Sequence, residues 1–150
     1  MNNISDNAGE LLAKTIEEKN IKVEELQNLL SIENAQSIEE RIDYFKKKKG
    51  WVSTYLTYAE AAGFEINFIL EKEEGERFSA ENLGELLEDV RKENRLNKQE
   101  FAEKKLNLTN YNNTYNAFYS NRCSFPKVHR LFEDTLGYKI KYKMKEKNNL

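Results

Sequence analysis

Apolar residues recur three and four positions apart through most of the chain, which is the spacing of amphipathic helices. In the second half this pattern predicts four helices, with the apolar faces Leu83, Leu86, Leu87 and Val90; Phe101 and Ala102; Tyr115, Phe118 and Tyr119; and Val128, Leu131, Phe132 and Leu136. In the first half it predicts four more, with the faces Leu11, Leu12 and Ile16; Leu26, Leu29 and Leu30; Ile38, Ile42 and Phe45; and Leu56, Ala59 and Ala62. Alternating apolar and polar residues over 64–70 and 138–144 predict a strand at the end of each half, with Ile69 interrupting the polar face of the first.

The two halves resemble each other in sequence. Gly9-Glu10-Leu11-Leu12 recurs as Gly84-Glu85-Leu86-Leu87, and 61–68 has a counterpart in 135–142, so two landmarks repeat at spacings of 75 and 74 residues. We therefore divide the chain into two copies of one unit, 1–74 and 79–150, with the polar segment 73–77 as the joint. The two predicted strands have backbone groups that need partners, and we expect them to pair with each other within the chain rather than with a second chain.

The second copy resembles a known family. The segment 83–104 is similar to the opening of a phage-repressor-like helix-turn-helix domain of the lambda repressor and Cro superfamily, and the two unit ends, 61–66 and 135–140, resemble members that add a strand after the last helix. The resemblance implies a mainly α fold of two tandem helix-turn-helix units, each with four to five helices and a terminal strand. Lys98 replaces the usual Gln at the start of the second helix, while the first copy has Val23 there and carries Glu39 and Glu40 on its third helix.

The charge of the whole chain argues against nucleic acid as a partner, but its distribution does not. Lys and Arg number 24 and Asp and Glu 26, which gives a net charge of −2. Divided at the repeat boundary, residues 1–75 carry a net charge of −6 and residues 76–150 carry +4. The acidic first copy and the basic second copy therefore predict different roles, although solvated faces that happen to differ would give the same counts.

The third helix of the second copy is the candidate recognition helix. If its aromatic residues are buried, Asn112, Asn113 and Asn116 share its outer side, and Asn forms bidentate hydrogen bonds with adenine in the major groove. An Asn-rich stretch is also consistent with an ordinary polar helix face. Cations at the ends of the neighbouring elements are expected to contact the DNA backbone, namely Lys98, Lys104, Arg122 and Lys127. The run Lys46, Lys47, Lys48 and Lys49 in the first copy is a possible auxiliary basic patch.

These features lead to two functional hypotheses. The first is a non-enzymatic, sequence-specific transcriptional regulator, of a phage or mobile-element type, that binds double-stranded DNA through its second copy. The first copy then serves as a pseudo-dimer partner within the chain, as part of a homodimer, or as a protein-docking unit. The alternative is a protein-binding adaptor on the same fold, such as an antitoxin, an antirepressor or a phage-type inhibitor of a host system. An exposed Trp51 or Tyr55 beside the lysine run favours the alternative, because aromatic residues anchor protein interfaces.

Other classes of protein are disfavoured by what the sequence does not contain. No apolar run approaches the length of a membrane helix and the first residues do not form a secretory signal, so we expect a cytoplasmic protein. Cys123 and His129 are single residues of their types, which is insufficient for a disulfide and for a common zinc site. We expect no catalytic site, no metal and no cofactor, because no phosphate-binding loop, ligand cluster or catalytic triad is recognisable.

Overall fold

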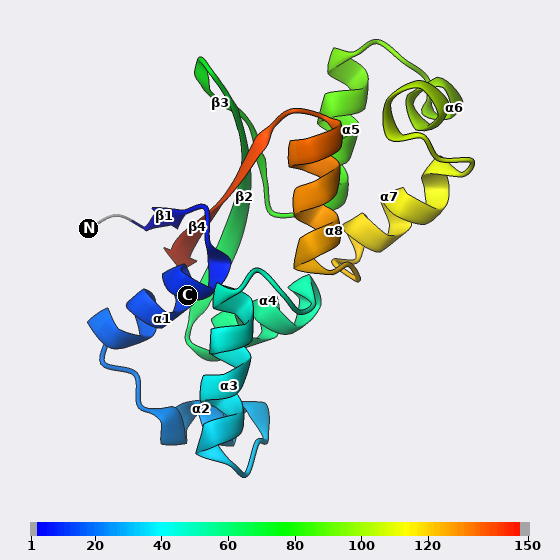
Figure 1. Ribbon diagram of the computed structural model, residues 1–150. Helices are drawn as coiled ribbons and strands as arrows, with labels where there is room; N and C mark the ends of the chain where they lie inside the picture. The colour runs from blue at the N-terminus through cyan, green and yellow to red at the C-terminus, as the bar shows by residue number, and fades with distance from the viewer. Residues whose placement is uncertain (1–2, 148–150) are drawn as a thin grey trace.

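A computed structural model describes residues 3–147. The first half forms β1 (Ile4–Ser5), α1 (Ala8–Glu18), α2 (Val23–Leu30), α3 (Ala35–Lys46), α4 (Val52–Ala61) and β2 (Phe64–Lys72). The second half forms β3 (Gly75–Ala80), α5 (Leu83–Glu93), α6 (Lys98–Phe101), α7 (Tyr111–Tyr119), α8 (Phe125–His129) and β4 (Lys139–Glu146); α6 and α8 continue as the π-helical segments η1 (Ala102–Leu106) and η2 (Arg130–Thr135). Figure 1 shows the helices of the two halves as two groups, blue to teal and green to orange, beside the sheet that they share.

The strands form one antiparallel sheet of order β1-β4-β2-β3. The two predicted strands are at its centre, where β2 pairs with β4 from Phe64 opposite Glu146 to Glu71 opposite Lys139. Pairing within the chain is therefore confirmed. The fold is mainly helical with a four-stranded sheet, which is more β structure than the sequence pattern predicts.

The strands β1 and β3 are missing from the prediction because neither carries a strong local signal. β1 has two residues, and β3 is an edge strand that includes Glu76 and Arg77. The segment expected to be a polar joint, 73–77, is the turn of the β2–β3 hairpin together with the start of β3, with Lys72 opposite Gly75. The two halves are thus connected by a tight hairpin within the sheet.

The two halves exchange their short strands. β1 of the first half pairs with β4 of the second, and β3, in the equivalent place before α5, pairs with β2 of the first half. At the centre of the sheet Phe68 lies opposite Tyr142, and these residues follow Gly63 and Gly137 by the same number of positions. Antiparallel pairing of equivalent residues means that an approximate twofold axis passes between them. The two central strands are therefore related by this approximate twofold axis.

Each half ties the start of its first helix to the end of its third helix with an asparagine. The side chain of Asn7 caps α1, and its amide donates a hydrogen bond of 2.8 Å to the carbonyl oxygen of Lys46 at the end of α3. Asn82 caps α5 in the same way and donates to the carbonyl oxygen of Tyr119 at the end of α7. The same local device is therefore used in both copies.

A glycine lies two residues after each capping asparagine, because the first and third helices of each half approach closely there. A Cβ atom on Gly9 would lie 2.2 Å from the backbone nitrogen of Lys46, and one on Gly84 would lie 2.8 Å from the Cα of Tyr119. Only a residue without a side chain fits such an approach. This contact gives a structural reason for the repeated Gly-Glu-Leu-Leu sequence.

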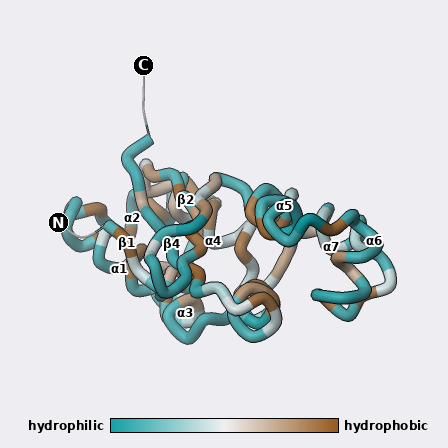
Figure 2. Tube along the Cα trace, turned by 90° about the horizontal axis from the view of Figure 1, so that it is seen from above, coloured by the Kyte–Doolittle hydropathy of each residue, from teal (hydrophilic) through white to brown (hydrophobic). Residues whose placement is uncertain are grey.

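One hydrophobic core serves both halves. Phe45 and Tyr55 from the first half and Phe125 and Tyr142 from the second form a buried aromatic cluster with ring centroids 5.4–6.3 Å apart. Figure 2 shows hydrophobic and hydrophilic residues alternating along the helices and strands, as expected for elements with one buried side. Edge-to-face aromatic pairs add about 0.5–1.5 kcal/mol each beyond the area that they bury, so the cluster couples the halves energetically.

The alternation in β4 divides the sheet into a buried face and a lysine-rich face. Ile140, Tyr142 and Met144 are buried, while the lysines between them remain partly exposed. Ile69, which was expected to interrupt a polar face, is only 4% exposed and lies opposite Lys141 on the neighbouring strand. Long lysine side chains cover apolar neighbours with their aliphatic parts, which explains how an isoleucine is tolerated on this face.

Candidate nucleic-acid interface

The predicted base-contacting residues lie on the outer side of α7. Asn112, Asn113 and Asn116 are exposed, while Tyr111, Thr114 and Phe118 face the protein interior. The buried residues are separated by three and four positions, so they form a narrow stripe on the side that packs against α5. The three asparagines are therefore placed where they can reach another molecule.

Two aromatic residues of α7 differ from the prediction. Tyr119 was expected in the apolar face but is 53% exposed, and Tyr115 is only partly buried. The stripe covered by the protein is too narrow to include them. The ring of Tyr115 is stacked on Tyr111, with centroids 6.0 Å apart, and tilted against Tyr119, with centroids 5.8 Å apart, and these three rings border the asparagine face.

A charged cluster fixes the N-terminal end of α7. The hydroxyl of Tyr111 donates to the carboxylate of Glu88 on α5, which also accepts two hydrogen bonds of 2.8 and 2.9 Å from Arg91. The Arg91 hydrogen bonds are the largest cause that lowers the pKa of Glu88, to about 2, and Tyr111 adds to this effect. Burial, followed by the bond to Glu88, raises the pKa of Tyr111, so the phenol remains a donor and the carboxylate an acceptor.

The other end of α7 is held by Asn82 and Gly84. The Asn82 amide donates to the carbonyl oxygen of Tyr119, and the close approach at Gly84 brings α5 against the same residue. Because both ends of α7 are bound to α5, the outer face of α7 is presented by a rigid support.

The predicted backbone-contacting cations are exposed, but they are not equivalent. The ammonium group of Lys98 lies 5.9 Å from the ring centroid of Tyr115, beside the asparagine face. Arg122 follows the end of α7, and Lys127 lies on α8. Lys104 forms an ion pair of 3.6 Å with Glu100, and the nearby carboxylate weakens the attraction of this lysine for an external phosphate.

The fold brings the lysine run of the first half close to the cations of the second. The loop after α3 and the loop after α7 form an isolated bridge between Trp51 and Ser124, with hydrogen bonds of 2.9 Å from Val52 N to Cys123 O and from Phe125 N to Gly50 O. The lysine run ends just before this bridge, and on its other side Arg122 precedes Ser124 in the loop after α7 while Lys127 follows Ser124 on α8. In the run, Lys46 forms an ion pair of 3.7 Å with Asp43.

Two residues at this junction, Arg41 and Tyr44, were not identified from the sequence. The charged groups of Arg41 and of Lys49, from the predicted basic patch, each lie 5.9 Å from the ring centroid of Tyr44, which is 44% exposed. The spacing of Arg41 and Tyr44, one helical turn apart next to the lysine run, is the sequence signal that could have found them. Trp51 is 54% exposed, whereas Tyr55 is fully buried, so only one of the two aromatic residues meets the condition that favours a protein interface.

The third helix of the first half has a different surface. Glu39 and Glu40 are exposed on α3, and Val23, which occupies the position of Lys98, is partly buried. Negative side chains on this face repel phosphate groups. The first half therefore offers no equivalent of the asparagine face on α7.

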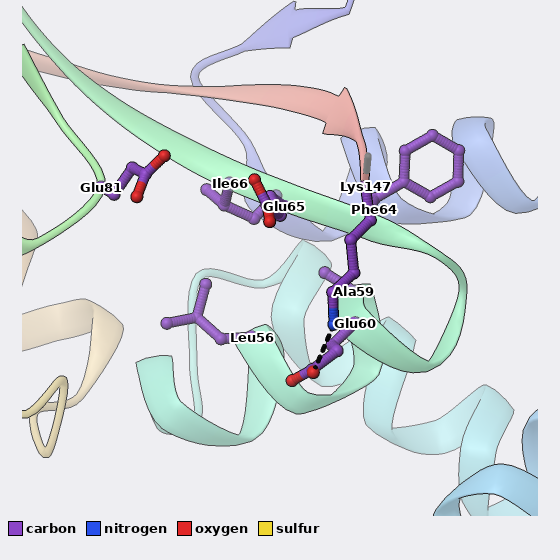
Figure 3. Close-up of a pocket in the computed structure, with 8 residues that line it drawn as sticks. All are labelled: Leu56, Ala59, Glu60, Phe64, Glu65, Ile66, Glu81 and Lys147. Atoms are coloured by element: carbon purple, nitrogen blue, oxygen red, sulfur yellow. Dashed lines mark hydrogen bonds and ion pairs between the residues drawn. The ribbon is translucent and has the colours of Figure 1, made fainter. Parts of the chain in front are cut away.

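The hollow shown in Figure 3 lies between α4 and β2 and contains none of the residues predicted to be functional. Leu56, Ala59 and Phe64 form part of its apolar wall, and Glu60 forms an ion pair of 2.8 Å with Lys147 at its edge. Among residues 3–147, no group of three or more His, Cys, Asp or Glu side chains is placed to hold a metal ion.

His129 and Cys123 are both built into the core region. Nε2 of His129 lies 2.9 Å from the hydroxyl of Tyr142, and Nδ1 lies 3.1 Å from a carboxylate oxygen of Glu133, so other groups engage both ring nitrogens. Cys123 is 2% exposed, and burial raises the pKa of its thiol to about 12. These environments are typical of structural residues.

Comparison with known proteins identifies no relative: no family model matches the sequence, and neither a curated protein nor a solved structure is significantly similar to the chain. In the described part of the chain, no helix has the length and apolar character needed to cross a membrane.

Proposed function

We propose that the protein is a sequence-specific DNA-binding regulator that places α7 in the major groove of double-stranded DNA. The observation that carries this proposal is the exposed face of Asn112, Asn113 and Asn116, supported from behind by α5. Asparagine side chains pair with the N6 and N7 atoms of adenine, and they do not repel phosphate groups. A short helix with an exposed polar face is suited to reading base edges in this groove.

The connection before α7 supports this proposal. Four residues separate η1 from α7, beginning with Asn107 in the left-handed conformation, and four residues separate α2 from α3, beginning with Ser31 in the same conformation. A short turn between two helices is typical of the helix-turn-helix motif, in which the second helix enters the groove. Lys98 at the start of α6 and Arg122 after α7 then lie on both sides of the proposed recognition helix, where phosphate contacts position it.

The experiment is a binding titration with a fluorescently labelled 30-base-pair AT-rich duplex, followed by anisotropy across a salt series. If Lys98, Lys104, Arg122 and Lys127 each neutralise one phosphate, log K falls with log salt at a slope of about −3.6, which is about 150-fold between 50 and 200 mM salt. Selection of preferred sequences from a random duplex pool then measures specificity.

Two variants distinguish contacts that position the protein on the DNA backbone from contacts that recognise the bases. Lys98→Glu should abolish binding, whereas Lys22→Glu, at the exposed lysine that immediately precedes α2 in the acidic half, serves as the control and should leave binding unchanged. The double variant Asn112→Ala/Asn116→Ala should lose sequence preference and retain weak, salt-sensitive binding. Absence of duplex binding at 50 mM salt, or equal loss in Lys98→Glu and Lys22→Glu, contradicts the proposal.

The surface of the first half favours a second candidate function, a protein-binding adaptor. Glu39 and Glu40 are exposed on α3, and Leu29 on α2 is 66% exposed, so acidic and apolar groups are available to a basic protein partner. In this case duplex DNA does not bind, and substitution of Leu29 or Glu40 removes partner binding while Lys98→Glu retains it.

A further inference from the structure

The approximate twofold axis passes through a second surface, which lies at the junction of the two halves. Trp51 immediately precedes α4 and Ser124 immediately precedes α8, so they occupy equivalent positions, and their backbones pair in an antiparallel bridge. A hollow at this place is lined by Arg41, Tyr44, Lys49, Gly50, Trp51, Ser124 and Pro126. We call these residues the junction surface.

The junction surface combines exposed aromatic rings with cations. The side chains of Trp51 and Tyr44 are 54% and 44% exposed, and the charged groups of Arg41 and Lys49 each lie 5.9 Å from the Tyr44 ring centroid. Aromatic rings pack on bases and sugars, and adjacent cations bind phosphates, so this combination suits nucleic acid.

The third helices place this surface relative to a bound duplex. α3 and α7 end at Lys46 and Tyr119, and each is followed after a few residues by the bridge between Trp51 and Ser124. The junction surface therefore lies between the C-terminal ends of the two helices, on the axis that relates them. When one helix of a twofold pair occupies a major groove, the surface on the axis faces the adjoining minor groove.

The cations are distributed as a minor groove requires. A minor groove is bordered by two phosphate backbones, and the junction surface is bordered by two basic segments, Lys46–Lys49 from the first half and Arg122 with Lys127 from the second. The two-sided arrangement therefore favours duplex DNA over an acidic protein segment.

We propose that the junction surface contacts the minor groove next to the major-groove turn bound by α7, with Trp51 packed against the sugars and base edges and Arg41 and Lys49 on the flanking phosphates. This inference rests on the proposed DNA binding and adds a second contact region to it. Because Trp51 has a serine as its symmetry counterpart, the contact is one-sided, and the DNA site of a single chain is asymmetric.

Trp51 is the only tryptophan of the chain, so its fluorescence reports on this surface alone. Titration with the 30-base-pair AT-rich duplex should change its emission and lower its acrylamide quenching constant at least twofold. Netropsin, which occupies AT-rich minor grooves, should reverse both changes. Trp51→Ser, which copies the residue found at the equivalent position of the second half, should weaken duplex binding by about fivefold or more without changing the salt slope.

Control variants make the failures distinguishable. Leu29→Ala removes another exposed apolar side chain, on α2 and outside the junction surface, and should leave duplex affinity unchanged. In one outcome, Asn112→Ala/Asn116→Ala loses sequence preference, the duplex leaves Trp51 emission as in the free protein, and Trp51→Ser binds the duplex as tightly as the wild type. The inference is then wrong and the DNA-binding proposal stands. If no duplex binds and polyglutamate protects Trp51 from acrylamide, the surface is an acidic-partner site and both proposals are wrong. If no duplex binds and polyglutamate gives no protection either, both proposals are also wrong.

Discussion

Replacing Gly9 by alanine tests the contact that fixes α1 against the end of α3. The new Cβ would lie 2.2 Å from the backbone nitrogen of Lys46 and 2.4 Å from the carbonyl carbon of Phe45. Ordinary contact begins at 3.4 Å, so α1 has to move away from α3 by about 1.2 Å. Both obstructing atoms belong to the backbone and cannot turn aside as a side chain does.

That movement also breaks the hydrogen bond of 2.8 Å from the Asn7 side chain to the Lys46 carbonyl. Overpacking costs about 1–3 kcal/mol and a lost hydrogen bond about 1 kcal/mol, so we expect the free energy of unfolding to fall by about 2–4 kcal/mol. In Gly84→Ala the closest atom is the Cα of Tyr119 at 2.8 Å, which requires a shift only half as large. Its expected cost is about 1–2 kcal/mol.

The assay is urea unfolding at 25 °C, followed by far-ultraviolet circular dichroism and by Trp51 fluorescence. Glu17→Ala, an exposed substitution on the same helix, is the control and should change the free energy of unfolding by less than about 0.5 kcal/mol. A Gly9→Ala protein as stable as the control, or one more stable than Gly84→Ala, would show that the close approach of α1 to α3 does not exclude a side chain at this position.

Three further predictions concern single side chains. Asn82→Ala removes the cap of α5 and the bond to the Tyr119 carbonyl, so the free energy of unfolding should fall by about 1–2 kcal/mol in the same urea assay; no change would contradict the role of this residue. Because the pKa of Glu88 is lowered to about 2, its stabilising effect is present above the ordinary carboxyl pKa of 4.5 and is lost as the pH falls towards 2. The urea midpoint of the wild type should therefore decrease more than that of Glu88→Gln over this pH range, and parallel curves would argue against it. Since burial raises the pKa of Cys123 to about 12, Ellman's reagent at pH 8 should label the native thiol at least about 100-fold more slowly than the urea-unfolded one, whereas similar rates would show an accessible thiol.

The sequence predicts the features of this fold that depend on neighbouring residues. Asn97 and Glu100 form both hydrogen bonds of a capping box at the start of α6, and Asn121 ends α7 with a φ of +58°. The alternating residues of β2 and β4 identify the two central strands, because their burial pattern has a period of two. β1 has no such pattern, since two residues are too few to show one, and its pairing depends on a strand at the other end of the chain.

The sequence predicts the exposed residues of the candidate site, but not the full extent of its buried face. The helical phase of Phe118 places Asn112, Asn113 and Asn116 on the outer side of α7, and the structure exposes all three. The phase does not determine how wide the buried stripe is, because the width depends on what packs against the helix. Tyr119 was therefore misplaced.

Because the two halves exchange strands, the difference in charge between them does not describe two independent domains. β1 and β3 each pair with a strand of the opposite half, and Tyr55 and Tyr142 share one buried cluster, so neither half can retain its core without the other. The net charges of −6 and +4 therefore belong to surfaces rather than to separable domains. The lysine run of the acidic half illustrates this, because the bridge between Trp51 and Ser124 places it next to the cations of the basic half. A division by surface separates the exposed carboxylates of α3 from the basic region formed by α7 and the junction, and this region includes residues from both halves.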